Sequence, residues 1–124
     1  MTDPDAASVA SMDLAELARS GAPRKPAWTY RGEDLNVNLV VLAPGERVAE
    51  HRNTEVDVLI LGITVDGTIE VDGQRHRVAQ GQIVVVPKGA RRAIQAGGVR
   101  FAYLTCHRRR AGLWPTTAVH HESS

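Results

Sequence analysis

Short apolar runs that alternate with polar residues make up most of the chain. Between positions 35 and 41 apolar side chains occupy every second position, and Asn36 and Asn38 lie between them. This is the period of a half-buried strand. The same criteria, with Asp-Gly and Pro-Gly pairs as breaks, predict extended segments at 35–41, 48–65, 68–71, 75–78, 83–86, 92–94 and 101–107. Short strands at this spacing indicate an all-β sandwich or barrel.

The N-terminal part follows a different pattern. Asp13 and Glu16 have the spacing of a capping box, and Gly21 is a natural stop, so we expect a short helix between them. Pro23 and Pro26 then predict an extended connector toward the barrel. The predicted organisation is an N-terminal tail, helix and connector (1–34), a β-barrel (35–110) and a C-terminal tail (111–124).

Composition narrows the classes of protein. A chain of 124 residues with 43% hydrophobic residues is suited to one domain with a real core. The net charge of +1 gives no reason to expect nucleic acid as a partner. Cys106 is the one cysteine, which excludes an intramolecular disulfide, and we expect it to be a buried structural thiol. Apolar runs too short for a bilayer and an N-terminus without a signal-peptide pattern predict a cytoplasmic protein with no membrane partner.

The most unusual stretch is the polar segment 51–57. His51, Asn53, Glu55 and Asp57 would project to one side of a regular strand. Imidazole and carboxylate groups are suitable ligands for a transition metal, so one interpretation is a strand that carries ligands into a cavity. The other is an exposed loop with ordinary polar residues, which the local pattern taken alone favours.

Two motifs in this order resemble those of the cupin superfamily, the RmlC-like jelly-roll barrels. The first consists of Gly45, five residues, His51-x-Asn53, three residues and Asp57. The second consists of Gly81, five residues and Pro87-x-Gly89, followed by Arg92 and Ala96 where cupins have His and Asn. The resemblance covers about 35–107 and implies an all-β cupin jelly roll, a double-stranded β-helix, with a short N-terminal helix.

Carried over from typical cupins, the metal ligands would fall on His51, Asn53, Asp57 and Arg92. A guanidinium remains protonated and would repel a divalent ion a few Å away by about 2 kcal/mol even in water. We therefore favour no metal cofactor. The alternative is a divalent transition metal (Fe, Mn, Ni or Zn) held by His51, Asp57 and His107.

Arg92 has two further interpretations. It forms an ion pair with Asp57 or Glu55, which we prefer, or it captures a small carboxylate or phosphate. Our hypothesis is that a ligand binds by replacing one of those acids. His107 is the other candidate: it either lies inside the barrel near His51 or is a histidine at the rim, and the rim is the simpler expectation. His76 is expected to be exposed, and His120-His121 to lie in a tail.

Two function classes remain open. The first is a small-molecule-binding cupin that uses a subset of His51, Asn53, Glu55, Asp57, Arg92 and His107, without a metal. The second is a metal-dependent enzyme, such as a dioxygenase or isomerase. The Arg108–Arg110 run is expected to be a solvated edge rather than a nucleic-acid site. By analogy with related small cupins, we also expect a homodimer.

Overall fold

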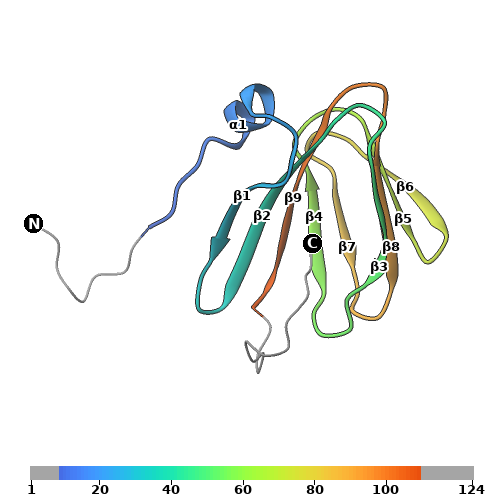
Figure 1. Ribbon diagram of the computed structural model, residues 1–124. Coiled ribbons are helices and arrows are strands. Elements are labelled where there is room, and N and C mark those ends of the chain that lie inside the picture. The colour runs from blue at the N-terminus through green and yellow to red at the C-terminus, as the bar shows by residue number, and fades with distance from the viewer. Residues whose placement is uncertain (1–8, 110–124) are drawn as a thin grey trace, which may run out of the picture.

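The computed structural model describes residues 9–109, which form two antiparallel sheets facing each other and one short helix (Figure 1). The first sheet has the strand order β1-β2-β9-β4-β7, and the second has the order β3-β8-β5-β6. The elements are α1 (Leu14–Ser20), β1 (Arg24–Arg31), β2 (Leu35–Leu42), β3 (Arg47–Arg52), β4 (Val58–Gly62), β5 (Gly67–Val71), β6 (Gln74–Val78), β7 (Ile83–Val86), β8 (Arg91–Ala96) and β9 (Phe101–Arg108). The predicted jelly-roll architecture is therefore confirmed.

Apolar side chains pack on both sides of the five-stranded sheet. The inward faces of the two sheets share a core that includes Leu42, Ile60, Ile69 and Phe101, all fully or nearly fully buried. Because side chains alternate along a strand, the opposite face of β2 and β9 presents a second apolar set. This second cluster lies under α1 and comprises Ala18, Leu39, Val41 and Ala102.

The predicted helix is confirmed, its N-terminus is capped by Asp13 as the sequence suggests, and Arg100, which the sequence did not indicate, holds its C-terminus. The Asp13 side chain accepts a hydrogen bond of 3.0 Å from the Glu16 backbone amide at the N-terminus of α1. At the other end the Arg100 guanidinium donates to the carbonyls of Ala18 and Gly21 at 3.0 and 2.6 Å. A cation at these carbonyls is favourable because the C-terminus of a helix carries a partial negative charge.

Two predictions about the strands need correction. The expected connector forms β1, which pairs with β2 through Trp28 opposite Leu39 and Tyr30 opposite Val37. From Trp28 onward, β1 pairs regularly with β2, which would otherwise be the unpaired edge strand of its sheet. The single extended stretch predicted for 48–65 is two strands, β3 and β4, which belong to different sheets.

The orientation of β2 also differs from a half-buried strand. Val40 and Leu42 belong to the core between the sheets, so Asn36 and Asn38 share that inward face. The other face carries Leu39 under α1. Both faces of β2 are covered because the helix and β1 add a second apolar layer. Among residues 9–109, no helix has the length and apolar character needed to cross a membrane.

Candidate functional site

A buried arginine lies in the barrel interior. Arg92 on β8 is only 2% exposed. It shares one face of the strand with Ile94 and Ala96, which belong to the core between the sheets. Its cross-strand partners are His51 on β3 and Val71 on β5. Directly paired residues of an antiparallel ladder place their side chains on the same face. A permanent cation and a half-buried imidazole are therefore neighbours on the inward face.

Tyr103 on β9 lies within the electrostatic reach of this cation. Its side chain is fully buried, and burial raises the pKa of the phenol above its ordinary value of 10.0, while the positive charge of Arg92 acts in the opposite direction. Tyr103 therefore stays protonated at neutral pH. Its hydroxyl is a neutral group that both donates and accepts hydrogen bonds inside the barrel.

Polar side chains gather at one end of the interior, where β3 and β9 finish and β2 and β8 begin (Figure 1). Thr105 and His107 follow Tyr103 on the inward face of β9, opposite Asn38 and Asn36 of β2. The Asn38 Nδ2 donates to Thr105 Oγ1 at 3.4 Å. This polar layer contrasts with the apolar core around Phe101, so the interior offers a polar compartment at this end.

The polar segment 51–57 is not a regular strand. β3 ends at Arg52, and the buried Asn53 begins a turn in which its Oδ1 accepts from the amides of Glu55 at 3.0 Å and Val56 at 3.2 Å. Such side-chain-to-backbone bonds compete with strand pairing. Glu55 and Asp57 are therefore exposed in the following loop rather than aligned with His51. The Asn53 Nδ2 is buried without a hydrogen-bond partner among the described residues.

A pocket of about 400 Å³ lies near this end of the barrel, on the outward side of the five-stranded sheet, where Leu59, Val85 and Cys106 line it side by side. We call it the mouth pocket; its polar lining is Glu55, Asp57, Lys88, His107 and Arg108, and its apolar lining includes Val56, Leu59 and Val85. Asp57 Oδ1 accepts from the Lys88 backbone amide at 2.8 Å, so this carboxylate braces the loop. Two carboxylates, the cationic side chains of Lys88 and Arg108, and the His107 imidazole surround the opening.

His107 joins the mouth pocket to the polar layer. It is 6% exposed on the inward face of β9 and also lines the pocket, so it is a buried histidine at the end of the barrel. Its Nδ1 lies 2.9 Å from the Arg108 carbonyl oxygen. The strand alternation through Phe101 and Tyr103, which was visible in the sequence, accounts for the inward orientation.

The side chains present do not fit a typical cupin metal. Within the described part of the chain, no three His, Cys, Asp or Glu side chains come together to hold an ion. Of the carried-over positions, Asp57 is exposed in the loop, and Arg92 brings a fixed positive charge next to His51. Repulsion between that charge and a divalent ion opposes binding.

The remaining candidates have simpler placements. His76 is exposed, as predicted. Cys106 is only partly buried and lines the mouth pocket from the outward face of β9, so the expectation of a fully buried thiol is wrong; burial raises its pKa. Arg109 is exposed and donates to the Gly32 carbonyl at 3.1 Å. Arg110, His120 and His121 lie outside the described residues.

Sequence reasoning missed the other polar residues that face the barrel interior. Tyr103, Thr105 and the asparagines of β2 face the same compartment, and only their alternation with apolar residues hinted at it. Two asparagines at alternate positions of an otherwise apolar strand were interpreted as its solvent face. The register with His107 and Thr105 would have reversed that interpretation, but pairing registers are not visible in a single sequence.

Comparison with known proteins assigns the class. The structure resembles a protein with a double-stranded β-helix domain from Klebsiella pneumoniae (TM-score 0.70, 16% identity, 84% of this chain and 93% of the other covered). It also resembles a cupin protein from Bacteroides fragilis (TM-score 0.57, 20% identity, 72% and 80% covered). The chain therefore has the cupin fold, as its motifs suggested. No protein-family model matches it.

A similarity in sequence points to one curated protein. The chain is 31% identical over 72 residues to the dimethylsulfoniopropionate lyase DddW of Ruegeria pomeroyi, which covers 56% of this chain and 47% of that protein. The match thus spans about half the length of the curated relative.

Proposed function

We propose that this chain binds a small anionic molecule, a carboxylate or a phosphate, inside the barrel without a metal. Arg92 is the residue that carries the proposal, with His51 and Asn53 beside it. The single supporting observation is that a permanently charged guanidinium, 2% exposed, faces the barrel interior. Removing such a group from water costs free energy, and an anion that enters the compartment offsets that cost.

The chemistry of the compartment favours an anion with two oxygens. A guanidinium presents a planar fork of donors that matches a carboxylate or phosphate, and such bonds are stronger where water is excluded. The buried Asn53 Nδ2 adds a neutral donor whose hydrogen-bonding capacity is unused within the described residues. The Tyr103 hydroxyl can donate to the same ligand because the pKa of the phenol is raised.

The mouth pocket is the proposed entrance. Lys88 and Arg108 attract an anion to it, and His107 lies at the boundary with the interior. Glu55 and Asp57 line the same opening and repel anions, so in this proposal the ligand displaces or shifts an acid as it enters. We further propose a cytoplasmic location, which is consistent with a binding role for a small metabolite.

The similarity to DddW favours one second candidate, an enzymatic one. Dimethylsulfoniopropionate contains a carboxylate, which is the group that Arg92 is suited to bind. We therefore propose this compound as the first carboxylate to test, both as a ligand and as a substrate. A metal-dependent mechanism through His51, Asp57 and His107 is disfavoured because no three such side chains come together in the part of the chain that the structure describes.

Isothermal titration calorimetry tests the proposal with acetate, propionate, inorganic phosphate and dimethylsulfoniopropionate. We expect saturable binding of at least one of them, and a loss of roughly tenfold or more in affinity in Arg92→Ala. Arg91→Ala is the matched control, because Arg91 is exposed on the other face of the same strand. Equal affinity in wild type and Arg92→Ala would overturn the proposal.

Two measurements distinguish the enzymatic candidate from the metal-free binding role. Loss of dimethylsulfoniopropionate on incubation with the protein, followed by proton NMR, would establish turnover. Metal analysis of protein purified without an affinity tag would reveal stoichiometric iron, manganese, nickel or zinc. A metal that is retained by wild type and lost in His51→Ala would overturn the metal-free assignment.

We also propose a homodimer. The outward face of the edge strand β7 exposes two large apolar side chains, with Ile83 55% and Val85 56% exposed. An exposed edge strand with apolar residues favours pairing with a second copy.

A further inference from the structure

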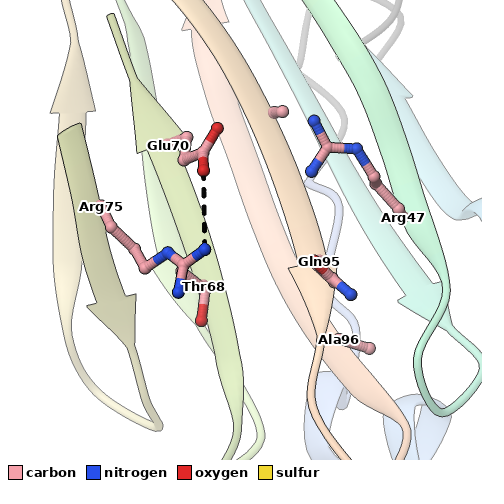
Figure 2. Close-up of a pocket in the computed structure, with 7 residues that line it drawn as sticks. Arg47, Thr68, Glu70, Arg75, Gln95 and Ala96 are labelled. Carbon is pink, nitrogen blue, oxygen red and sulfur yellow. Dashed lines mark ion pairs between the residues drawn. The ribbon is translucent and has the colours of Figure 1, made fainter. Parts of the chain in front are cut away.

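We propose a second anion site, on the outward face of the four-stranded sheet, that binds a phosphate group. The site is a hollow of about 230 Å³ that Ala93 of β8 lines together with longer side chains, and Figure 2 shows it in close-up. Its polar side chains come from all four strands of the sheet: Arg47 from β3, Gln95 from β8, Thr68 and Glu70 from β5, and Arg75 from β6.

A small residue among long ones creates the hollow. Ala93 lies directly opposite Glu70 in the ladder, and its neighbour on the same face, Gln95, lies opposite both Thr68 and Arg47. The alanine is only 3% exposed although it faces outward, because the surrounding long side chains rise above it. The sheet therefore carries a depression walled by polar groups rather than a flat surface.

The charge over this hollow is positive. The Arg47 guanidinium extends over the sheet from one side (Figure 2) and makes no ion pair with any residue that the structure describes. On the other side Arg75 lies 3.8 Å from the Glu70 carboxylate, and the two side chains are 75% and 35% exposed. An exposed pair at that separation contributes little free energy, so Arg75 can reorient toward a ligand at small cost.

The donors match a phosphate group. Two guanidinium forks can approach different oxygens of one tetrahedral anion, and the Thr68 hydroxyl and Gln95 amide supply neutral donors between them. The volume is below the roughly 300–1,000 Å³ of typical drug-sized sites, which favours a compact phosphate or phosphomonoester over a larger ligand. Glu70 is the one acid of the hollow, and it competes with the anion for Arg75.

This site is separate from the one in the barrel. Side chains of β8 alternate, so Arg92 faces inward whereas Ala93 and Gln95 face the hollow. Substitutions on the outward face therefore leave Arg92 and the mouth pocket intact. The two proposals can succeed or fail independently of each other.

Titration of wild-type protein with inorganic phosphate, at an ionic strength held constant with sodium chloride, tests the proposal. The readout is the backbone amide shifts of Thr68, Ala93 and Gln95 in two-dimensional NMR spectra. We expect saturable shifts, and affinity that falls by roughly fivefold or more in Arg47→Gln. Glu70→Gln removes the competing carboxylate, and we expect it to increase the affinity several-fold.

Arg52→Gln is the matched control, because it removes the same charge from the same strand without touching the hollow. We expect it to change the affinity by less than about twofold, as screened charges at a distance act weakly. Shifts that do not saturate, or equal losses in Arg47→Gln and Arg52→Gln, would indicate general charge attraction and overturn the site. Weaker binding in Glu70→Gln would also overturn it.

Discussion

His51 lies directly opposite Arg92 across the β3–β8 ladder, on the inward face of the barrel. In the pattern that this chain resembles, both positions are metal ligands. Here one of them is a guanidinium that is 2% exposed, and its charge cannot be titrated away at any ordinary pH. The pair places a buried cation beside an imidazole where the resembled pattern has two metal ligands, and this is the arrangement on which the proposed anion binding rests.

Arg92→Met separates a binding role from a structural one. The substitution keeps most of the volume and removes the buried charge; deleting one member of a buried charged pair on which the fold depends costs about 3–5 kcal/mol. If Arg92 serves the ligand, we expect calorimetric anion binding to be lost in Arg92→Met while the free energy of unfolding in urea falls by less than about 3 kcal/mol. A larger loss would assign Arg92 to folding instead.

Gly67 has no room for a side chain. A Cβ at this position would lie 2.3 Å from Cε2 of Phe101, which is fully buried and cannot move aside. We expect Gly67→Ala to lower the free energy of unfolding by about 1–3 kcal/mol, the usual cost of overpacking a core. In Gly98→Ala the new Cβ would meet nothing within 4 Å, and we expect a change below about 0.5 kcal/mol in the same urea experiment. Equal effects at the two glycines would contradict this account of the packing.

The architecture could be predicted from the sequence because its signals are local. Asp72-Gly73 marks the β5–β6 hairpin, and the glycine and proline spacings of the two motifs match the observed loops around β3 and β7. Asp66-Gly67, which also has the sequence of a hairpin turn, instead joins β4 to β5, and these strands belong to different sheets. β1 was missed because its evidence is not local. Pro23 just before it and Pro26 within it favour a connector, and only the partner strand β2 completes its hydrogen bonds.

The candidate site was predicted less completely. Arg92 was identified by its position in a motif, and its burial agrees with a role inside the barrel. The direction of Glu55 and Asp57 depends on the Asn53 turn, because β3 ends at Arg52, before either acid is reached. Whether an asparagine side chain bonds to its own backbone or to a neighbour depends on what surrounds it, and a single sequence does not contain that information.

Glu46 makes stability depend on pH. Its carboxylate accepts from Lys25 Nζ at 2.7 Å and from the Ala43 amide at 2.9 Å, and these bonds hold its pKa below the ordinary value of 4.5. A group whose pKa is lower in the folded state stabilises that state above its unfolded pKa and loses this effect as pH falls through the folded pKa.

We therefore expect Glu46→Gln to cost about 0.5–1 kcal/mol at neutral pH, a modest value because the pair is near the surface. The difference from wild type should shrink to nothing in acid, well below the ordinary pKa, where wild-type Glu46 is itself protonated. Urea unfolding at several pH values measures both effects. Glu50→Gln is the control, since Glu50 is exposed and has no hydrogen bond or ion pair among the described residues. A cost for Glu46→Gln that persists unchanged in acid would contradict the assignment.

Val85 provides a test of the proposed homodimer. It is 56% exposed on the outward face of β7, which pairs with β4 on one side and forms the edge of its sheet on the other. Light scattering coupled to gel filtration should show wild-type protein at twice the mass of one chain, and Val85→Lys should be monomeric because burying a lysine in an apolar contact is unfavourable.

Val65→Lys is the control: the substitution is the same and Val65 has a similar exposure, 55%, but it lies in the loop between β4 and β5, so we expect this variant to remain dimeric. A monomeric wild type would refute the homodimer, and dissociation by Val65→Lys but not by Val85→Lys would move the interface away from β7.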